Sequence, residues 1–293
     1  MHLSNWRDNR SYNIEKYVYK NNVSNIWCGL GSDSKRHKVF VKILNYGNFL
    51  DASMTLDFVN AFEQEAITLK RVSECSNAVP KLYDSWNDRK NKKYIIVMKM
   101  VPGISLRKWL DTHKKNELQA KDIFVRKCII IQLCEIMRDI NNKYSAIVHR
   151  DLKPENIFVN FNANLRRWEV YIVDFGCANL NHIRYVGTKN YQAPEQIGKK
   201  NTKVTICNKT DIFAIGQIFY EMLLGEPPKI GIDYLSKANE KQWIQVPEMN
   251  SYLLQIQGVD KIQKVLEDMT RFDMNDRCTY ERIITNLKNI RVG

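Results

Sequence analysis

The stretch HRDLKPEN, residues His149–Asn156, determines the fold that we predict for this chain. An eight-residue match to one fixed pattern arises by chance at about one in 10¹⁰ per position, so the signal is highly specific. Two shorter motifs follow it, DFG at Asp174–Gly176 and APE at Ala193–Glu195. Together they predict a functional site rather than polar residues that merely cap helices or face solvent.

These motifs, in this order, resemble those of the eukaryotic-type (Hanks-type) serine/threonine protein kinases. The resemblance covers about residues 14–290. It implies an α+β, bilobal fold, with a small β-rich N-lobe over residues 1–100 and a larger helical C-lobe over residues 101–293. The two lobes would form one kinase domain, with the ATP cleft at their junction near Met98–Val101.

The resemblance assigns the chemistry to four polar residues. Phosphoryl transfer requires little covalent work from a protein, which has to position the reactants and neutralise charge. Asp151 would orient the substrate hydroxyl and accept its proton, and Lys153 would neutralise the transferred group. Asn156 and Asp174 would hold Mg²⁺, which prefers hard oxygen ligands.

In the N-lobe, Lys42 matches the lysine that binds the ATP phosphates, and Glu65 matches its ion-pair partner. The predicted nucleotide-binding set is Lys42, Glu65, Asn21, Val23, Ser24, Ile26, Phe40, Met98, Lys99, Met100, Phe158 and Asp174.

Features of the C-lobe indicate a protein substrate. GTKNYQAPE (Gly187–Glu195) resembles a loop that docks the substrate segment, with Thr188 expected to hydrogen-bond towards Asp151 and Lys153. Asp211 resembles the carboxylate that braces the catalytic loop, and Arg277 the buried partner of Glu195.

The glycine-rich loop of the family is missing. Aligning back from Lys42 places Tyr19–Ile26 over that loop, and no glycine occurs there. Glycine lets the backbone approach phosphates closely. Because asparagine tolerates the left-handed region, Asn21 and Asn22 are candidate substitutes, and we expect weaker or slower ATP binding.

Two aromatic residues, Phe40 and Phe158, stand where the family has smaller apolar residues around adenine. They would either sandwich the purine or fill its space. If they fill it, the chain is a pseudokinase scaffold with impaired ATP turnover, the alternative to a Mg²⁺–ATP-dependent serine/threonine kinase.

Arg150 is typical of kinases that are switched by phosphorylation of the activation loop. Between Gly176 and Gly187 the only hydroxyl is that of Tyr185. We therefore expect the loop to fold without phosphate and the enzyme to be intrinsically active.

Composition excludes other classes of protein. Of the 293 residues, 44% are hydrophobic and 26% charged, and no apolar run reaches the roughly 18 residues of a membrane span. The seven cysteines lack CxxC spacing, which argues against a disulfide framework or a zinc site. We predict a cytoplasmic protein with no membrane partner. The net charge of +13 favours acidic protein substrates and leaves nucleic-acid binding open.

Short patterns predict several elements. The β-branched runs Val39–Ile43 and Tyr94–Met98, each after a basic turn, predict strands, as does Val170–Val173. Apolar spacing predicts helices over about 58–69, 121–143, 212–222 and 279–290, the third ended by Gly225. The helix over 121–143 is expected to bury one face made of Phe124, Ile131, Cys134, Met137 and Ile140.

Overall fold

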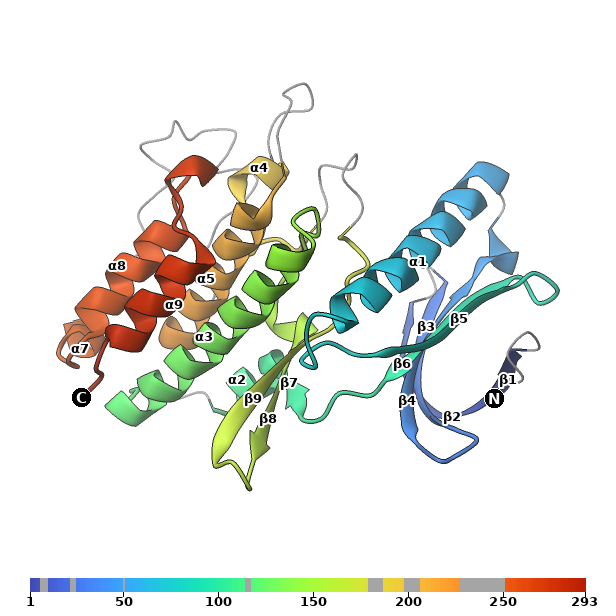
Figure 1. Cartoon of the computed structure of the whole chain (residues 1–293), viewed down its shortest axis with the longest axis horizontal. Helices are drawn as coiled ribbons and strands as arrows, with labels where there is room; N and C mark the ends of the chain where they lie inside the picture. The colour runs from blue at the N-terminus through green and yellow to red at the C-terminus, as the bar shows by residue number, and fades with distance from the viewer. Residues whose placement is uncertain are drawn as a thin grey trace. The chain divides into compact units, whose positions relative to one another are not determined.

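The computed structural model describes residues 1–5, 10–21, 25–49, 51–113, 117–178, 187–197, 206–226 and 251–293. The chain forms two compact units, Met1–Val101 and Pro102–Gly293, coloured blue to cyan and green to red in Figure 1.

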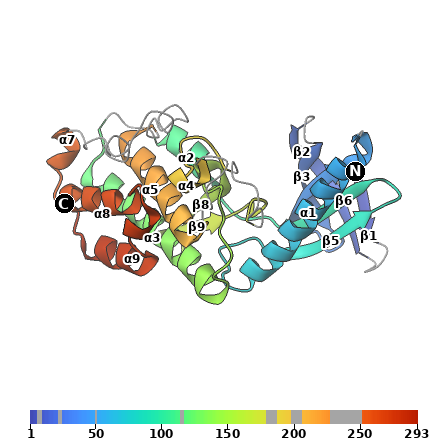
Figure 2. The same ribbon diagram turned by 90° about the horizontal axis from the view of Figure 1, so that it is seen from above.

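The first unit is an antiparallel sheet with one long helix. Its six strands are ordered β1-β2-β3-β4-β6-β5. The elements are β1 (His2–Asn5), β2 (Arg10–Asn21), β3 (Ile26–Asp33), β4 (Lys38–Asn45), the short 3-10 helix η1 (Tyr46–Asn48), α1 (Ala52–Ser73), β5 (Leu82–Asp88) and β6 (Lys93–Lys99). Helix α1 packs against β4, β5 and β6 (Figure 2).

The predicted elements of this unit are confirmed. The run Val39–Ile43 lies in β4 and Tyr94–Met98 lies in β6, which pair with each other. The basic clusters form the turns of two hairpins, at residues 34–37 and 89–92. Helix α1 begins after Asp51, whose side chain accepts a hydrogen bond from the backbone N–H of Ser53.

The sheet curls until its two outer strands share one core. Strands β1 and β5 stand at opposite ends of the strand order, yet Asn5 Nδ2 of β1 donates to Asp84 Oδ1 of β5 over 2.9 Å. Tyr12 of β2 stacks on Trp86 of β5 with ring centroids 6.2 Å apart. Leu3 is buried in the same apolar cluster as Tyr12 and Trp86. The sequence patterns did not predict β1 or this curl.

The second unit is built mainly from helices. It contains β7 (Ile104–Ser105), α2 (Leu106–Thr112), α3 (Ala120–Lys143), the 3-10 helix η2 (Pro154–Asn156), β8 (Ile157–Asn162), β9 (Arg167–Ile172), α4 (Pro194–Ile197), α5 (Asn208–Leu224), α7 (Ser251–Leu254), α8 (Val259–Met269), the 3-10 helix η3 (Met274–Asp276) and α9 (Tyr280–Asn289). The short strands β7, β8 and β9 form a second antiparallel sheet.

Helix α5 forms the centre of this unit, because every residue from 210 to 223 is buried. It packs against α3 and α8, and α3 also packs against α9 (Figure 1). Gly225 ends α5 with a φ of 85°, the left-handed conformation that glycine adopts without strain. A fully buried helix fixes its side chains firmly, so α5 is a rigid base for the polar groups at its N-terminus.

The four helices and the third strand expected from the sequence are present. One predicted face is wrong in part, because Phe124 of α3 is 52% exposed. Ile123, one position earlier, is buried in its place. In the part of the chain that the structure describes, no helix is long and apolar enough to cross a membrane.

Candidate active site

Asp151 lies at the centre of a triangle of polar side chains. Its Oδ1 accepts a hydrogen bond of 2.7 Å from the hydroxyl of Thr188, and its Oδ2 lies 2.9 Å from Lys153 Nζ. Lys153 Nζ also donates to Thr188 Oγ1 over 2.8 Å. The expected contacts of Thr188 are therefore present, and they join the HRDLKPEN stretch to the segment around Thr188.

The backbone that carries Asp151 is held from α5. The carboxylate of Asp211 accepts hydrogen bonds from the backbone N–H groups of His149 (2.7 Å) and Arg150 (2.9 Å). Asp211 is fully buried, and burial raises its pKa, although the two N–H donors act in the opposite direction. Arg150 has a φ of 68°, a left-handed conformation that needs such external support.

His149 links this loop to the segment around Asp174. Its ring Nδ1 accepts from the N–H of Asp151 (3.4 Å), so Nε2 carries the proton and donates to the carbonyl of Val173 (3.1 Å). Phe175 packs on the same ring at 4.7 Å between centroids. Asp174, between these two anchored residues, is exposed and has a φ of 64°.

Asn156 and Asp174 form a donor set that fits Mg²⁺. Asn156 Nδ2 donates to the carbonyl of Asp151 (2.9 Å), so Oδ1 is the amide atom that can serve as a ligand. The backbone N–H of Val173, next to Asp174, donates to the carbonyl of Asn156 (2.9 Å). Mg²⁺ is usually bound by one or two protein oxygens together with phosphates. Among the described residues, no group of three or more His, Cys, Asp or Glu side chains forms a larger metal site.

In the first unit, Lys42 and Glu65 form the expected ion pair. Lys42 Nζ on β4 lies 2.8 Å from both carboxylate oxygens of Glu65 on α1. The ring of Phe62, one turn earlier on α1, lies 5.3 Å from the ammonium group. Both charged side chains are largely removed from solvent, which strengthens their attraction and fixes the lysine in place.

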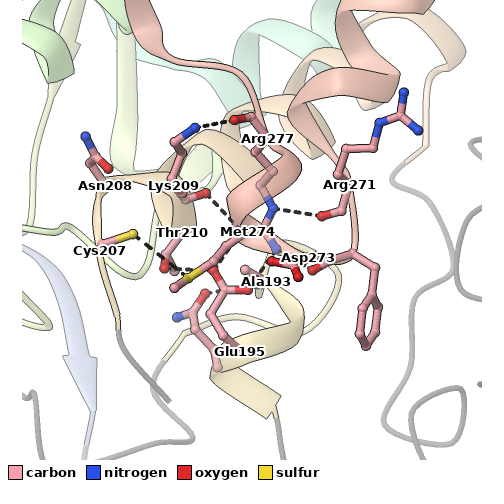
Figure 3. Close-up of polar contacts among 12 residues, drawn as sticks. Ala193, Glu195, Cys207, Asn208, Lys209, Thr210, Arg271, Asp273, Met274 and Arg277 are labelled. Atoms are coloured by element: carbon pink, nitrogen blue, oxygen red, sulfur yellow. Dashed lines mark hydrogen bonds and ion pairs between the residues drawn. The ribbon is translucent and has the colours of Figure 1, made fainter. Parts of the chain in front are cut away.

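Glu195 of α4 forms a buried ion pair with Arg277, which lies between η3 and α9 in the sequence (Figure 3). The guanidinium donates to both carboxylate oxygens, over 2.7 and 2.8 Å. Its remaining N–H groups donate to the carbonyls of Lys209, Arg271 and Phe272. All five N–H groups of Arg277 are therefore used.

The carboxylate of Glu195 has a second partner on α5. Thr210 Oγ1 donates to it over 2.8 Å (Figure 3). Thr210 directly precedes Asp211, so the first turn of α5 holds both the backbone of His149 and Arg150 and the Glu195 side chain of α4.

Comparison with known proteins agrees with this geometry. Residues 30–287 match the family model of the protein kinase domain. The chain belongs to the protein kinase family. The resemblance drawn from the three motifs and the predicted α+β class, with a β-rich first region and a helical second region, are confirmed.

Several relatives of the chain are kinases, and two of the three described here are named as serine/threonine-protein kinases. Serine/threonine-protein kinase 1 of Heliothis zea nuclear polyhedrosis virus is 27% identical over 246 residues, which are 76% of this chain and 82% of the viral protein. Human serine/threonine-protein kinase Nek2 is 26% identical over 259 residues, 84% of this chain and 52% of the human protein. Mouse Aurora kinase C is 29% identical over 203 residues, 65% of this chain and 66% of the mouse protein. The kinase thus spans about half the length of Nek2 and more of the other two.

The glycine-free stretch Tyr19–Ile26 of the kinase includes the end of β2 and the first residue of β3. Asn21 ends β2 opposite Ile26, the first residue of β3. The side chain of Asn21 and all of Val23 and Ser24, with Asn22, lie outside the described residues. Asn25 adopts a φ of 52°, so this asparagine, not considered from the sequence, takes the left-handed conformation.

The residues predicted around adenine are divided between the two units of the kinase. Phe40 on β4 is half-buried and stands directly opposite Met98 on β6. Lys99 ends β6 with an exposed side chain, and Met100, directly after it, is half-buried. Phe158 belongs to β8 of the second unit. Both alternatives for Phe40 and Phe158, a sandwich around the purine or a filled pocket, stay predictions. The expectation drawn from Tyr185 also stays a prediction, because Tyr185 lies outside the described residues.

A further network, which includes Tyr191 of the segment Gly187–Glu195, was not found from the sequence. Tyr191 donates its hydroxyl proton to Glu221 (2.6 Å), and Arg107 of α2 donates to Tyr191, Glu221 and Glu155. Burial alone would lower the pKa of Arg107, but hydrogen bonds to Glu221 and Glu155 outweigh it and raise that pKa. Arg107 and Glu221 are 114 positions apart, so no local pattern connects them.

Proposed function

We propose that the kinase transfers the γ-phosphoryl group of ATP, bound with Mg²⁺, to serine or threonine hydroxyls of a protein substrate. The observation that carries this proposal is the triangle of Asp151, Lys153 and Thr188, in which a carboxylate, a cation and a hydroxyl lie within 3 Å of one another. The serine/threonine kinases among its relatives support the same specificity.

Asp151 is the base of this mechanism. Its carboxylate would accept the hydrogen bond of the substrate hydroxyl, align that oxygen with the γ-phosphorus and take the proton as the new P–O bond forms and ADP leaves. Lys153 Nζ, at 2.9 Å from Asp151, holds one carboxylate oxygen in place and offers positive charge to the transferred group. Thr188 fixes the other oxygen.

Lys42, Asn156 and Asp174 would bind the nucleotide. Glu65 holds the ammonium of Lys42, which would contact the phosphates of ATP. Asn156 and Asp174 would hold Mg²⁺, which when bound neutralises charge on the phosphates. The absence of glycine from Tyr19–Ile26 is expected to weaken this binding without removing these charged groups.

The substrate is proposed to be a protein, because the loop Gly187–Glu195 that resembles a docking segment is anchored through Glu195. The net charge of +13 favours acidic acceptors. No observation favours the pseudokinase alternative over a working kinase. The cytoplasmic location remains a prediction from the sequence.

A transfer assay tests the proposal. Purified protein is incubated with Mg²⁺, γ-labelled ATP and two acceptors, casein and myelin basic protein, beside the Asp174→Asn variant. We expect label on an acceptor with the wild type and a large loss with the variant. Absence of transfer by folded wild-type protein, with both acceptors, would refute the proposed activity.

A further inference from the structure

The peptide bond between Arg150 and Asp151 carries the catalytic base on a strained backbone. Arg150 has a φ of 68°, a region that residues with a Cβ atom rarely adopt. Such a conformation persists only where the surroundings fix it from several sides. Asp211 fixes it on one side, through the N–H of Arg150.

Gln196 fixes the conformation of Arg150 through its carbonyl group. Its Nε2 donates to the carbonyl of Arg150 over 2.8 Å, and its Oε1 accepts from the backbone N–H of Ala193 over 2.9 Å. Gln196 is 1% exposed. Water therefore cannot replace these hydrogen bonds, and a side chain that lacked them would leave buried polar groups unsatisfied.

Gly187 makes room for this contact. Its φ is 123°, and a Cβ atom there would lie 2.8 Å from the carbonyl oxygen of Arg150 and 3.1 Å from Nε2 of Gln196. Three segments of the chain thus converge on one carbonyl oxygen, and only glycine fits at this position.

The backbone of Gln196 is itself anchored. The preceding residue, Glu195, is held by Arg277 and Thr210 (Figure 3). Thr210 and Asp211 are neighbours on α5, as Glu195 and Gln196 are on α4. Asp211 and Gln196 therefore hold Arg150 at its N–H and at its carbonyl group, respectively.

We propose that Gln196 is a positioning residue, which ties the loop Gly187–Ile197 to the peptide that carries Asp151. This proposal rests on the proposed kinase activity and names a residue that sets the position of its base. Because the amide of Gln196 contacts both segments, the placement of the Asp151 carboxylate depends on the conformation of the docking loop. Gln196 touches no reacting atom, so it acts only through Asp151.

The test compares Gln196→Leu and Gln196→Glu with Gln217→Leu. Gln217 is a matched control, since it is 2% exposed on α5 and its Nε2 makes no hydrogen bond in the described part of the chain. Displacing a catalytic group by about 1 Å can cost about a hundredfold in rate. We expect Gln196→Leu to lower kcat about 10- to 100-fold with a KM for ATP within about twofold, and Gln217→Leu to change neither.

Gln196→Glu adds a readout that a merely structural role would not move. A protonated carboxyl group can donate to the carbonyl of Arg150 and accept from Ala193, whereas an ionised one cannot donate. Burial raises the pKa of such a carboxyl group. The ratio of variant to wild-type kcat should therefore rise from pH 8 to pH 6, measured where both proteins are fully folded. If Gln196→Leu does not fold, the pH dependence of this ratio decides whether Gln196 positions Asp151.

Hydrogen exchange in residues 149–153 separates the two proposals. Faster exchange in Gln196→Leu than in Gln217→Leu supports the anchoring of residues 149–153 by Gln196, even if the wild type transfers no phosphate. In that case the proposed kinase activity is refuted and the positioning role of Gln196 is not. Unchanged exchange together with either of two kinetic results would overturn the role of Gln196. These results are a kcat of Gln196→Leu within twofold of wild type, or a ratio of variant to wild-type kcat for Gln196→Glu that does not depend on pH.

Discussion

Replacing Arg277 by leucine should destabilise the second unit strongly. The side chain is 0% exposed, and all five of its N–H groups are used, two of them on the carboxylate of Glu195. The Arg277→Leu variant leaves that carboxylate buried, with the hydroxyl of Thr210 as its remaining partner among the residues drawn in Figure 3. Removing one partner of a buried pair typically costs about 3–5 kcal/mol.

Thermal and urea unfolding measure this loss. For a unit of this size, each kcal/mol lowers Tm by about 2–4 °C, so Tm should fall by about 6–20 °C. The exposed arginine of a surface pair is the control: Arg282 is 66% exposed and 3.7 Å from Asp268, so Arg282→Leu should cost less than about 1 kcal/mol.

A double-mutant cycle tests the physical reason. In Arg277→Leu/Glu195→Leu the unpaired charge is gone, so its destabilisation should be smaller than the sum of the two single variants. A loss below about 1 kcal/mol for Arg277→Leu, or strictly additive single effects, would show that the pair does not hold α4.

Three further predictions follow from the same contacts. Asp211→Asn should lower kcat at least about tenfold and the free energy of unfolding by about 1–3 kcal/mol, because one amide oxygen cannot accept from the N–H groups of both His149 and Arg150 as two carboxylate oxygens do. Steady-state kinetics measure the first loss and urea unfolding the second. A variant with wild-type kcat would contradict this prediction. Gly225→Ala should cost only about 1 kcal/mol, since a Cβ atom there meets no atom of the described residues within 4 Å, whereas Gly187→Ala should cost more because a Cβ atom there meets a carbonyl oxygen at 2.8 Å. Equal losses in urea unfolding would refute this steric argument. Burial raises the pKa of Cys278 to about 11, so the folded state keeps a proton that the unfolded state loses above about pH 9. The free energy of unfolding should therefore fall from about pH 9 to pH 11, and it should fall less steeply in Cys278→Ala. Unfolding curves recorded at several pH values check this.

Much of the fold follows from local patterns in the sequence. The strands β4 and β6 are β-branched runs bounded by basic turns, and α3, α5 and α9 show apolar residues at helical spacing. These signals depend on neighbouring residues only. The same periodicity misplaced Phe124, because it locates a helical face only approximately while the packing of neighbouring helices decides which positions are buried.

The contacts between distant residues could be predicted only where a motif fixed the roles. The ion pairs of Lys42 with Glu65 and of Arg277 with Glu195 were expected on that ground. Asn5 and Asp84, 79 positions apart, belong to no motif, and neither periodicity nor composition says which distant polar groups meet. The same holds for Gln196, whose neighbours in the sequence give no sign of its contact with Arg150.

The most direct test of the account is the identity of the phosphorylated residue and its dependence on Asp151. Wild-type protein and Asp151→Asn are incubated with Mg²⁺, γ-labelled ATP and casein, and the label on the acceptor is assigned to serine, threonine or tyrosine. We predict label on serine or threonine and a loss of at least about a hundredfold in Asp151→Asn, as expected for removal of a positioned base. Label on tyrosine alone, or near wild-type transfer by the folded variant, would contradict the account.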